Sequence, residues 1–95
     1  MHARVVRFTD VNPDRLNKIV SEVDQADGPP PGVDSTGFKL FVDEDQGTAL
    51  FVGYFDTKEK MHAASAIFDQ MDPSDTPGTR ASVDLCEVKL ERSGT

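Results

Sequence analysis

The chain is poor in the residues that build the commonest special sites. Its 95 residues include one cysteine, Cys86, one tyrosine, Tyr54, two histidines and no tryptophan. A single cysteine excludes an intrachain disulfide, and beside Leu85 and Val88 we interpret it as a small packed side chain rather than a nucleophile. The histidines and the cysteine do not recur at metal-ligand spacing, and no dinucleotide-binding glycine motif is present, so we expect no metal and no cofactor.

Positive charge is also scarce. Acidic residues number 17 against 10 basic ones, which gives a net charge of −7 without any cluster of Lys and Arg. Such a chain repels nucleic-acid phosphates and anionic headgroups, so we expect neither nucleic acid nor a membrane as a partner. No apolar run approaches membrane-spanning length, and the opening stretch MHARVVRF lacks the apolar segment and cleavage site of a signal peptide. These features predict a cytoplasmic protein.

The length of the chain predicts one domain over residues 1–95. A mass of 10.4 kDa lies near the common domain size. Hydrophobic residues make up 37% and charged residues 28%, which is typical of globular proteins. We expect residues 91–95 to form a disordered tail.

The hydrophobic pattern changes period along the chain. Runs rich in β-branched and aromatic residues predict strands at 3–8, 38–42, 49–55 and 80–90. Helical spacing appears twice between these strands. The resulting order, β-α-β-β-α-β, predicts an α+β, ferredoxin-like fold, in which a four-stranded antiparallel sheet carries both helices on one face.

Each predicted helix has a recognisable start and an apolar stripe. We expect the first helix to begin with Asn12 as N-cap and Pro13 as first residue. The second is expected to begin after Asp56 and to run to Met71, with His62 facing water opposite the apolar stripe. The stripes predicted to be buried are Leu16, Ile19, Val20 and Val23 in the first helix, and Met61, Ala64, Phe68 and Met71 in the second.

The predicted hairpin divides its side chains between two faces of the sheet. Pairing across a two-residue turn at Gln46 and Gly47 places a wholly apolar set on one face: Phe38, Leu40, Val42, Ala49, Phe51, Gly53 and Phe55. The other face receives a mixed set: Lys39, Phe41, Asp43, Leu50, Val52 and Tyr54. We expect the apolar set to lie beneath the helices.

The mixed face would be exposed in a monomer, because both helices cover the other face. Monomeric proteins rarely leave such an apolar patch in water. The simplest cover is a second copy of the chain. We therefore expect a homodimer in which two sheets face each other as a dimeric α+β barrel with a partly polar interior.

Three stretches resemble the dimeric α/β-barrel superfamily, the group of antibiotic-biosynthesis monooxygenases and stress-responsive A/B-barrel proteins. They are the first strand RVVRF, the strand-to-helix passage ALFVGYFDTKEKMHAA and the closing strand SVDLCEV. The resemblance implies a homodimer that binds a small organic ligand in a pocket inside the barrel or between sheet and helices. It implies, as an alternative, a cofactor-independent monooxygenase that acts on an aromatic or polyketide-like substrate.

Two departures from that superfamily restrict the chemistry that the resemblance implies. Members that degrade haem use a tryptophan together with asparagine and histidine, and this chain has no tryptophan. The stress-responsive branch has a histidine in its first strand where this chain has Arg4. Neither haem degradation nor that histidine chemistry is therefore expected, and no catalytic residue is assigned.

Four residues are candidates for ligand binding: Arg4, Lys39, Phe41 and Tyr54. The first, second and fourth are polar residues within apolar strands, where desolvation costs free energy unless a partner compensates. A lysine or arginine holds a carboxylate or enolate oxygen, and a tyrosine donates a hydrogen bond. Phe41 shares the mixed face with Lys39 and Tyr54.

Structural roles are the alternative interpretation of the polar candidates. Arg4 would lie at a strand end, Lys39 would protect an edge strand from pairing, and Tyr54 would pack with its hydroxyl in water. Asp84 is a weaker candidate, because it would neutralise Arg4 or Arg7 across the sheet.

Overall fold

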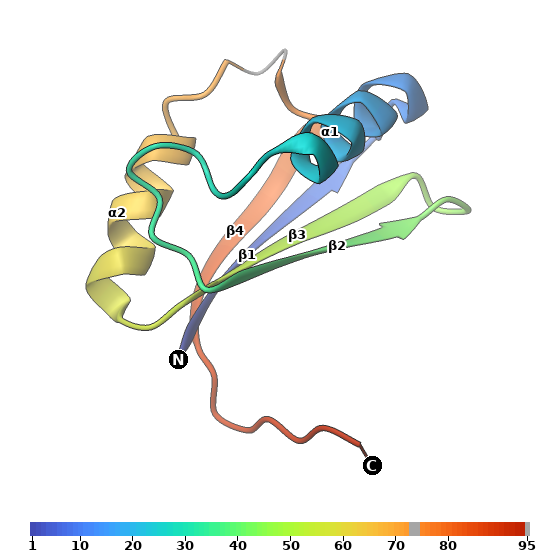
Figure 1. Cartoon of the computed structure of the whole chain (residues 1–95). Coiled ribbons are helices and arrows are strands. Elements are labelled where there is room, and N and C mark those ends of the chain that lie inside the picture. The colour runs from blue at the N-terminus through green and yellow to red at the C-terminus, as the bar shows by residue number, and fades with distance from the viewer. Residues whose placement is uncertain (73–74, 95) are drawn as a thin grey trace.

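The structure, a computed structural model, describes residues 1–72 and 75–94. Its elements follow the predicted order and make an α+β, ferredoxin-like fold (Figure 1). They are β1 (His2–Thr9), α1 (Pro13–Gln25), β2 (Gly37–Asp43), β3 (Thr48–Phe55), α2 (Lys58–Phe68) and β4 (Thr79–Glu87). None of these helices has the length and apolar character needed to cross a bilayer.

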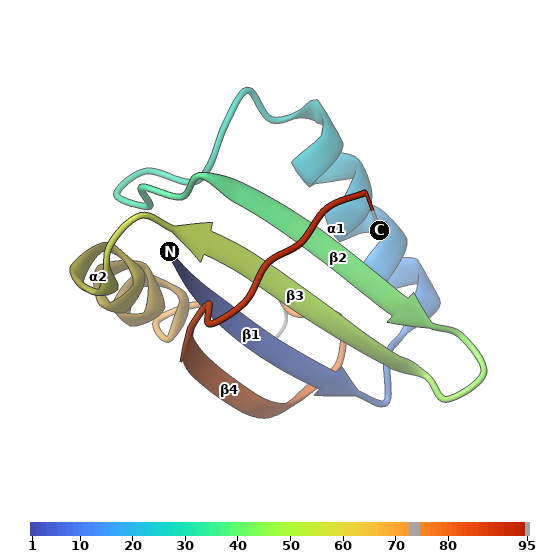
Figure 2. The same cartoon turned by 90° about the horizontal axis from the view of Figure 1, so that it is seen from below.

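The four strands form one antiparallel sheet in the order β2-β3-β1-β4. Both helices lie on the same side of this sheet (Figure 1). Figure 2 looks onto the opposite side, which we call the open face, with the helices behind the strands. The edges of the sheet are therefore β2 and β4. Among the described residues no helix or strand covers the open face, although the segment after β4 passes in front of it (Figure 2).

The hairpin register confirms the predicted division of side chains, although the turn is longer than expected. Leu40 pairs with Phe51, and the last pair joins Asp43 to Thr48, so the turn spans residues 44–47. The Asp43 carboxylate accepts hydrogen bonds from the Gln46 backbone N–H at 3.2 Å and side-chain amide at 2.7 Å. Because a four-residue turn and a two-residue turn have the same parity, each side chain keeps its predicted face.

Helix α1 begins as predicted but packs less closely than its stripe suggests. The Asn12 side chain accepts hydrogen bonds from the second and third helical N–H groups at 3.0 and 3.1 Å, and Pro13 occupies the first position. Leu16 is buried, whereas Val20 and Val23 are 42% and 48% exposed. The prediction that the whole stripe is buried was therefore wrong for its second half.

Helix α2 differs from its prediction at both ends. Thr57, not Asp56, is the N-cap, and its hydroxyl accepts a hydrogen bond of 3.2 Å from the Lys60 N–H. The helix ends at Phe68 instead of Met71, which lies beyond the helix and is 44% exposed. The N-cap one residue later satisfies the free N–H group at the third helical position.

The tightest part of the core lies beneath α2 and includes a residue from the connector. Phe55 and Met61 are 1% exposed, and Ala64 is fully buried. They pack with Val33, which anchors the proline-rich connector between α1 and β2. His62 faces solvent on the other side of α2, as predicted.

Strand β4 ends at Glu87, three residues before the predicted end. The Val88 N–H still donates a hydrogen bond of 3.0 Å to the Met1 carbonyl, after which the chain leaves the sheet (Figure 1). Leu90 is 84% exposed. Residues 88–94 contain no helix or strand.

Candidate functional site

The structure separates the four predicted ligand-binding residues. Lys39, Phe41 and Tyr54 lie on the open face, as the hairpin pattern predicted. Arg4 pairs with Gly53, which belongs to the helix-covered face, and its side chain points toward α2. Three of the four residues therefore share a surface, and Arg4 lies on the other side of the sheet.

Arg4 is buried among protein partners. Its Nε donates a hydrogen bond of 3.1 Å to the Ser65 hydroxyl, and its guanidinium lies 4.9 Å from the centre of the Phe68 ring. Burial lowers the pKa of Arg4, the nearby Asp69 carboxylate at 3.8 Å opposes that shift, and Arg80 adds to it. Among described residues no buried side-chain polar atom lacks a hydrogen-bond partner. These contacts support a structural role for Arg4, well inside its strand.

The same cluster joins α2 to the edge of the sheet. The Asp69 carboxylate, just after α2, accepts a hydrogen bond of 2.8 Å from Arg80 in β4. Asp69 therefore faces two guanidinium groups, of Arg4 and Arg80. One carboxylate between two arginines links helix and edge strand.

Three cross-strand rows make up the centre of the open face. Read from β2 through β3 and β1 to β4, they are the Phe41 row (Phe41, Leu50, Arg7, Ser82), the Lys39 row (Lys39, Val52, Val5, Asp84) and the Tyr54 row (Gly37, Tyr54, Ala3, Cys86). Each row has apolar side chains at or near its middle. Charged groups occupy both edges of the Lys39 row, whereas Arg7 lies in the middle of the Phe41 row and Tyr54 in the middle of its own row.

The exposed apolar groups of this face gather near the hairpin. Phe41 is 52% exposed and Leu50 is 37% exposed. They adjoin a hollow of about 340 Å³, which is lined by Arg7, Phe41, Val42, Asp43, Thr48, Ala49 and Leu50. In the neighbouring rows the Lys39 ammonium lies 6.0 Å from the centre of the Tyr54 ring, a cation–π geometry. Lys39 is exposed on edge strand β2, which also fits the protective role considered for it.

Arg7 is the residue that sequence reasoning left out of the candidate site. It lies on the open face beside Leu50, half-buried. The sequence could have identified it, because Arg7 lies three residues after Arg4 in the same strand. An odd separation places the two arginines on opposite faces of that strand. Asp84 is also on the open face, so of the two arginines considered as its partners only Arg7 shares its surface.

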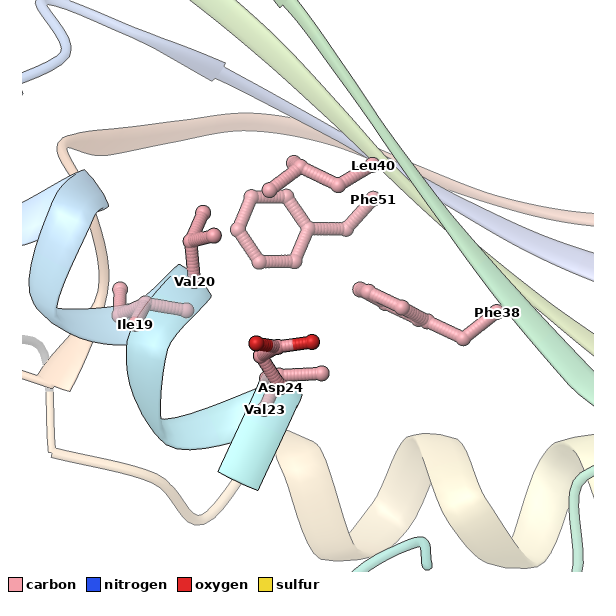
Figure 3. Close-up of a pocket in the computed structure, with 7 residues that line it drawn as sticks. All are labelled: Ile19, Val20, Val23, Asp24, Phe38, Leu40 and Phe51. Atoms are coloured by element: carbon pink, nitrogen blue, oxygen red, sulfur yellow. The ribbon is translucent and has the colours of Figure 1, made fainter. Parts of the chain in front are cut away.

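A second hollow lies on the helix side, between α1 and the β2–β3 hairpin. Figure 3 shows the side chains of the helix and the strands pointing toward one another across this groove of about 210 Å³. Its lining is apolar except for Asp24: Ile19, Val20, Val23, Asp24, Phe38, Leu40 and Phe51. The groove exists because the second half of α1 is held away from the strands, which leaves Phe38 46% exposed.

Within residues 1–72 and 75–94, no three His, Cys, Asp or Glu side chains are placed to hold a metal ion. No protein-family model, curated protein or solved structure showed significant similarity to the chain. The superfamily resemblance of the sequence therefore stays a prediction. The open face, which combines exposed apolar side chains with Arg7, Lys39, Tyr54 and Asp84, is the strongest candidate site.

Proposed function

We propose that the protein is a homodimer in which the open faces of two sheets pack into an α+β barrel, and that this barrel holds a small organic ligand. The balance of charge on the open face carries the proposal. The strand residues of that face include two cations, Arg7 and Lys39, and two anions, Asp43 and Asp84. The strand residues of this face therefore have no net charge, although the whole chain has a net charge of −7.

Two copies of an acidic chain repel each other, and a face without net charge is where they can approach with the least repulsion. The half-exposed Phe41 and the exposed Leu50 add apolar area, which is released from water when the face is covered. Face-to-face packing of two sheets would bury both residues in a layer about 10 Å thick. The superfamily resemblance predicts the same assembly.

The side chains of the open face favour a small anionic, aromatic ligand. Lys39 supplies a positive charge, Tyr54 a hydroxyl donor and Phe41 an apolar surface, all from one hairpin. Arg7 adds a second cation beside the hollow at the hairpin end. These groups bind and orient a ligand, whereas no described group stands out as a nucleophile or proton-transfer base, so we propose binding rather than oxygenation. The cytoplasmic setting predicted from the sequence belongs to the same proposal.

An anionic aromatic dye, 8-anilinonaphthalene-1-sulfonate, tests the ligand site by fluorescence titration. We expect Lys39→Met to weaken dye binding about tenfold, since one charge-assisted contact is lost. The matched control Lys18→Met, in the exposed part of α1, is expected to bind the dye like the wild type. A second control, Val23→Asp, places a charge in the α1 groove and should leave binding unchanged. Loss of binding in Val23→Asp, with normal binding by Lys39→Met, would move the site to the groove and contradict the proposal.

A further inference from the structure

We infer that the two-fold axis of the dimer runs parallel to the strands, so that Lys39 of each copy pairs with Asp84 of the partner subunit. The inference rests on the proposed homodimer and adds its geometry. It follows from the three rows of the open face. For each possible two-fold axis, these rows determine which residues of the two copies face each other.

Two sheets packed face to face are related by a two-fold axis lying in the plane between them. An axis parallel to the strands reverses the order of the strands but preserves each row. Strand β2 then faces β4 of the partner subunit, and β3 faces β1 of the partner subunit. An axis perpendicular to the strands instead places every strand over its own copy.

The parallel axis makes the Lys39 row complementary to itself. Lys39 lies opposite the partner's Asp84, and Val52 lies opposite the partner's Val5. Symmetry forms each of these pairs twice. A long lysine and a short aspartate together suit the roughly 10 Å between packed sheets. Opposite charges thus meet at both edges of the interface, and two valine pairs meet in its centre.

The neighbouring rows also match in size under this axis. Tyr54, the largest side chain of its row, lies opposite the partner's Ala3. Phe41 lies opposite the partner's Ser82 at the other end of the face. In these two pairs a large side chain meets a small one. In the Phe41 row Leu50 also lies opposite the partner's Arg7 and packs against its apolar stem.

The perpendicular axis brings like charges together. Centred on the Lys39 row, it places Lys39 over the partner's Lys39 and Asp84 over the partner's Asp84. Like charges facing each other across an interface cost several kcal/mol. Displaced by half a row spacing, toward the hairpin, it places Lys39 over the partner's Phe41 and leaves the charge unpaired. The parallel axis is the arrangement that pairs the charges at both edges.

Pairing with the partner leaves Lys39 available to the proposed ligand. An ammonium group has three donors, so it can hold the partner's Asp84 and a ligand oxygen together. The pair would also hold the lysine side chain over the barrel interior. The ligand site is then built from both copies.

Charge reversal at the two positions tests the pairing by sedimentation equilibrium. We expect Lys39→Glu and Asp84→Lys each to weaken dimerisation by a factor of about 10 to 100, because two attractive pairs become repulsive. The double variant restores both pairs and is expected to dimerise within about threefold of the wild type. Lys18→Glu and Glu59→Lys, on exposed helix positions, change the net charge by the same amounts and serve as matched controls.

The outcomes separate the pairing from the dimer itself. A monomeric wild type would overturn the proposed homodimer. A dimeric wild type with single variants that dimerise equally well, or a double variant that fails to recover, would overturn only the pairing. Circular dichroism of each variant checks that the exposed edge-strand substitutions leave the fold intact.

Cross-linking gives a second measurement that does not depend on charge. In a Cys86→Ser background, Lys39→Cys and Asp84→Cys chains are mixed and treated with a short bismaleimide. The two positions lie on opposite edges of the sheet, about 14 Å apart at the usual strand spacing. We expect a covalent dimer in the mixture and none from either chain alone. Cross-linking of Lys39→Cys chains to each other would contradict the parallel axis.

Discussion

The Nε of Arg4 and the Oγ of Ser65 are 3.1 Å apart, and this hydrogen bond fastens α2 to the middle of the sheet. The guanidinium also stacks on Phe68 and lies near Asp69, both at the end of the same helix. Arg4, a charged residue that is 8% exposed, therefore links β1 to α2.

We expect Arg4→Ala to lower the free energy of unfolding by about 2–4 kcal/mol, because it removes buried stem packing and a charge-assisted hydrogen bond. Arg4→Met keeps the apolar stem and should cost about half as much. Chemical denaturation measures both values, with Arg92→Ala in the exposed C-terminal segment as the control. Equal stabilities of Arg4→Ala and Arg92→Ala would show that the contacts of Arg4 with α2 do not contribute to the free energy of unfolding.

Gly78 precedes β4 at a point where the backbone is crowded. A Cβ at this position would lie 2.5 Å from the Thr9 carbonyl oxygen and 2.9 Å from that of Asp10. Neither oxygen can move without shifting the end of β1. We therefore expect Gly78→Ala to destabilise the protein by about 1–3 kcal/mol.

Gly28 provides the matched control for this prediction. It has open space around the corresponding Cβ position, so Gly28→Ala is expected to be neutral or stabilising by up to about 1 kcal/mol. Thermal denaturation of the two variants compares them directly. A Gly78→Ala variant as stable as Gly28→Ala would contradict the close approach of the two backbone segments.

Lys60 holds the connector before β2 against α2 through an exposed ion pair. Its ammonium lies 3.0 Å from the Asp34 carboxylate, and this hydrogen bond and the negative charge raise the pKa of Lys60. A raised pKa in the folded state means that the stabilisation is present below the unfolded pKa of about 10.4 and disappears as pH rises through the folded value.

The expected effect is a stability difference between the wild type and Lys60→Met that is constant from about pH 7 to 9 and vanishes in more alkaline solution. Salt should reduce it at all pH values, because the pair is solvent-exposed. Denaturant titrations at several pH values measure the difference. A gap that widens above the pKa of lysine would have the wrong sign.

Sequence reasoning predicted the elements and the faces of the hairpin, because alternation along two strands joined by an even turn leaves little freedom. The structure accordingly places Phe41 and Tyr54 on the same face of the sheet, as expected. The period-two pattern also shows that Arg4 and Arg7 face opposite ways. It cannot show which one faces the helices, because that depends on the pairing of Arg4 with Gly53 in another strand.

The distance between α1 and the sheet also cannot be predicted from the periodicity of the sequence. The apolar stripe of α1 shows which side of the helix faces the sheet, and Leu16 is buried on that side. It does not show how closely the helix lies, and Val20 and Val23 remain exposed beside the groove in Figure 3. Tertiary contacts, including the long connector anchored by Val33, decide that distance.

Mass measurement by sedimentation equilibrium tests the central claim, that the open face binds a second copy of the chain. At micromolar concentration the wild type is expected at twice 10.4 kDa. Leu50→Lys, which places a second cation beside Arg7 on the open face, is expected at 10.4 kDa, while Val20→Lys on the helix side stays dimeric. A wild type of 10.4 kDa, or a Leu50→Lys variant that remains dimeric, would contradict the account.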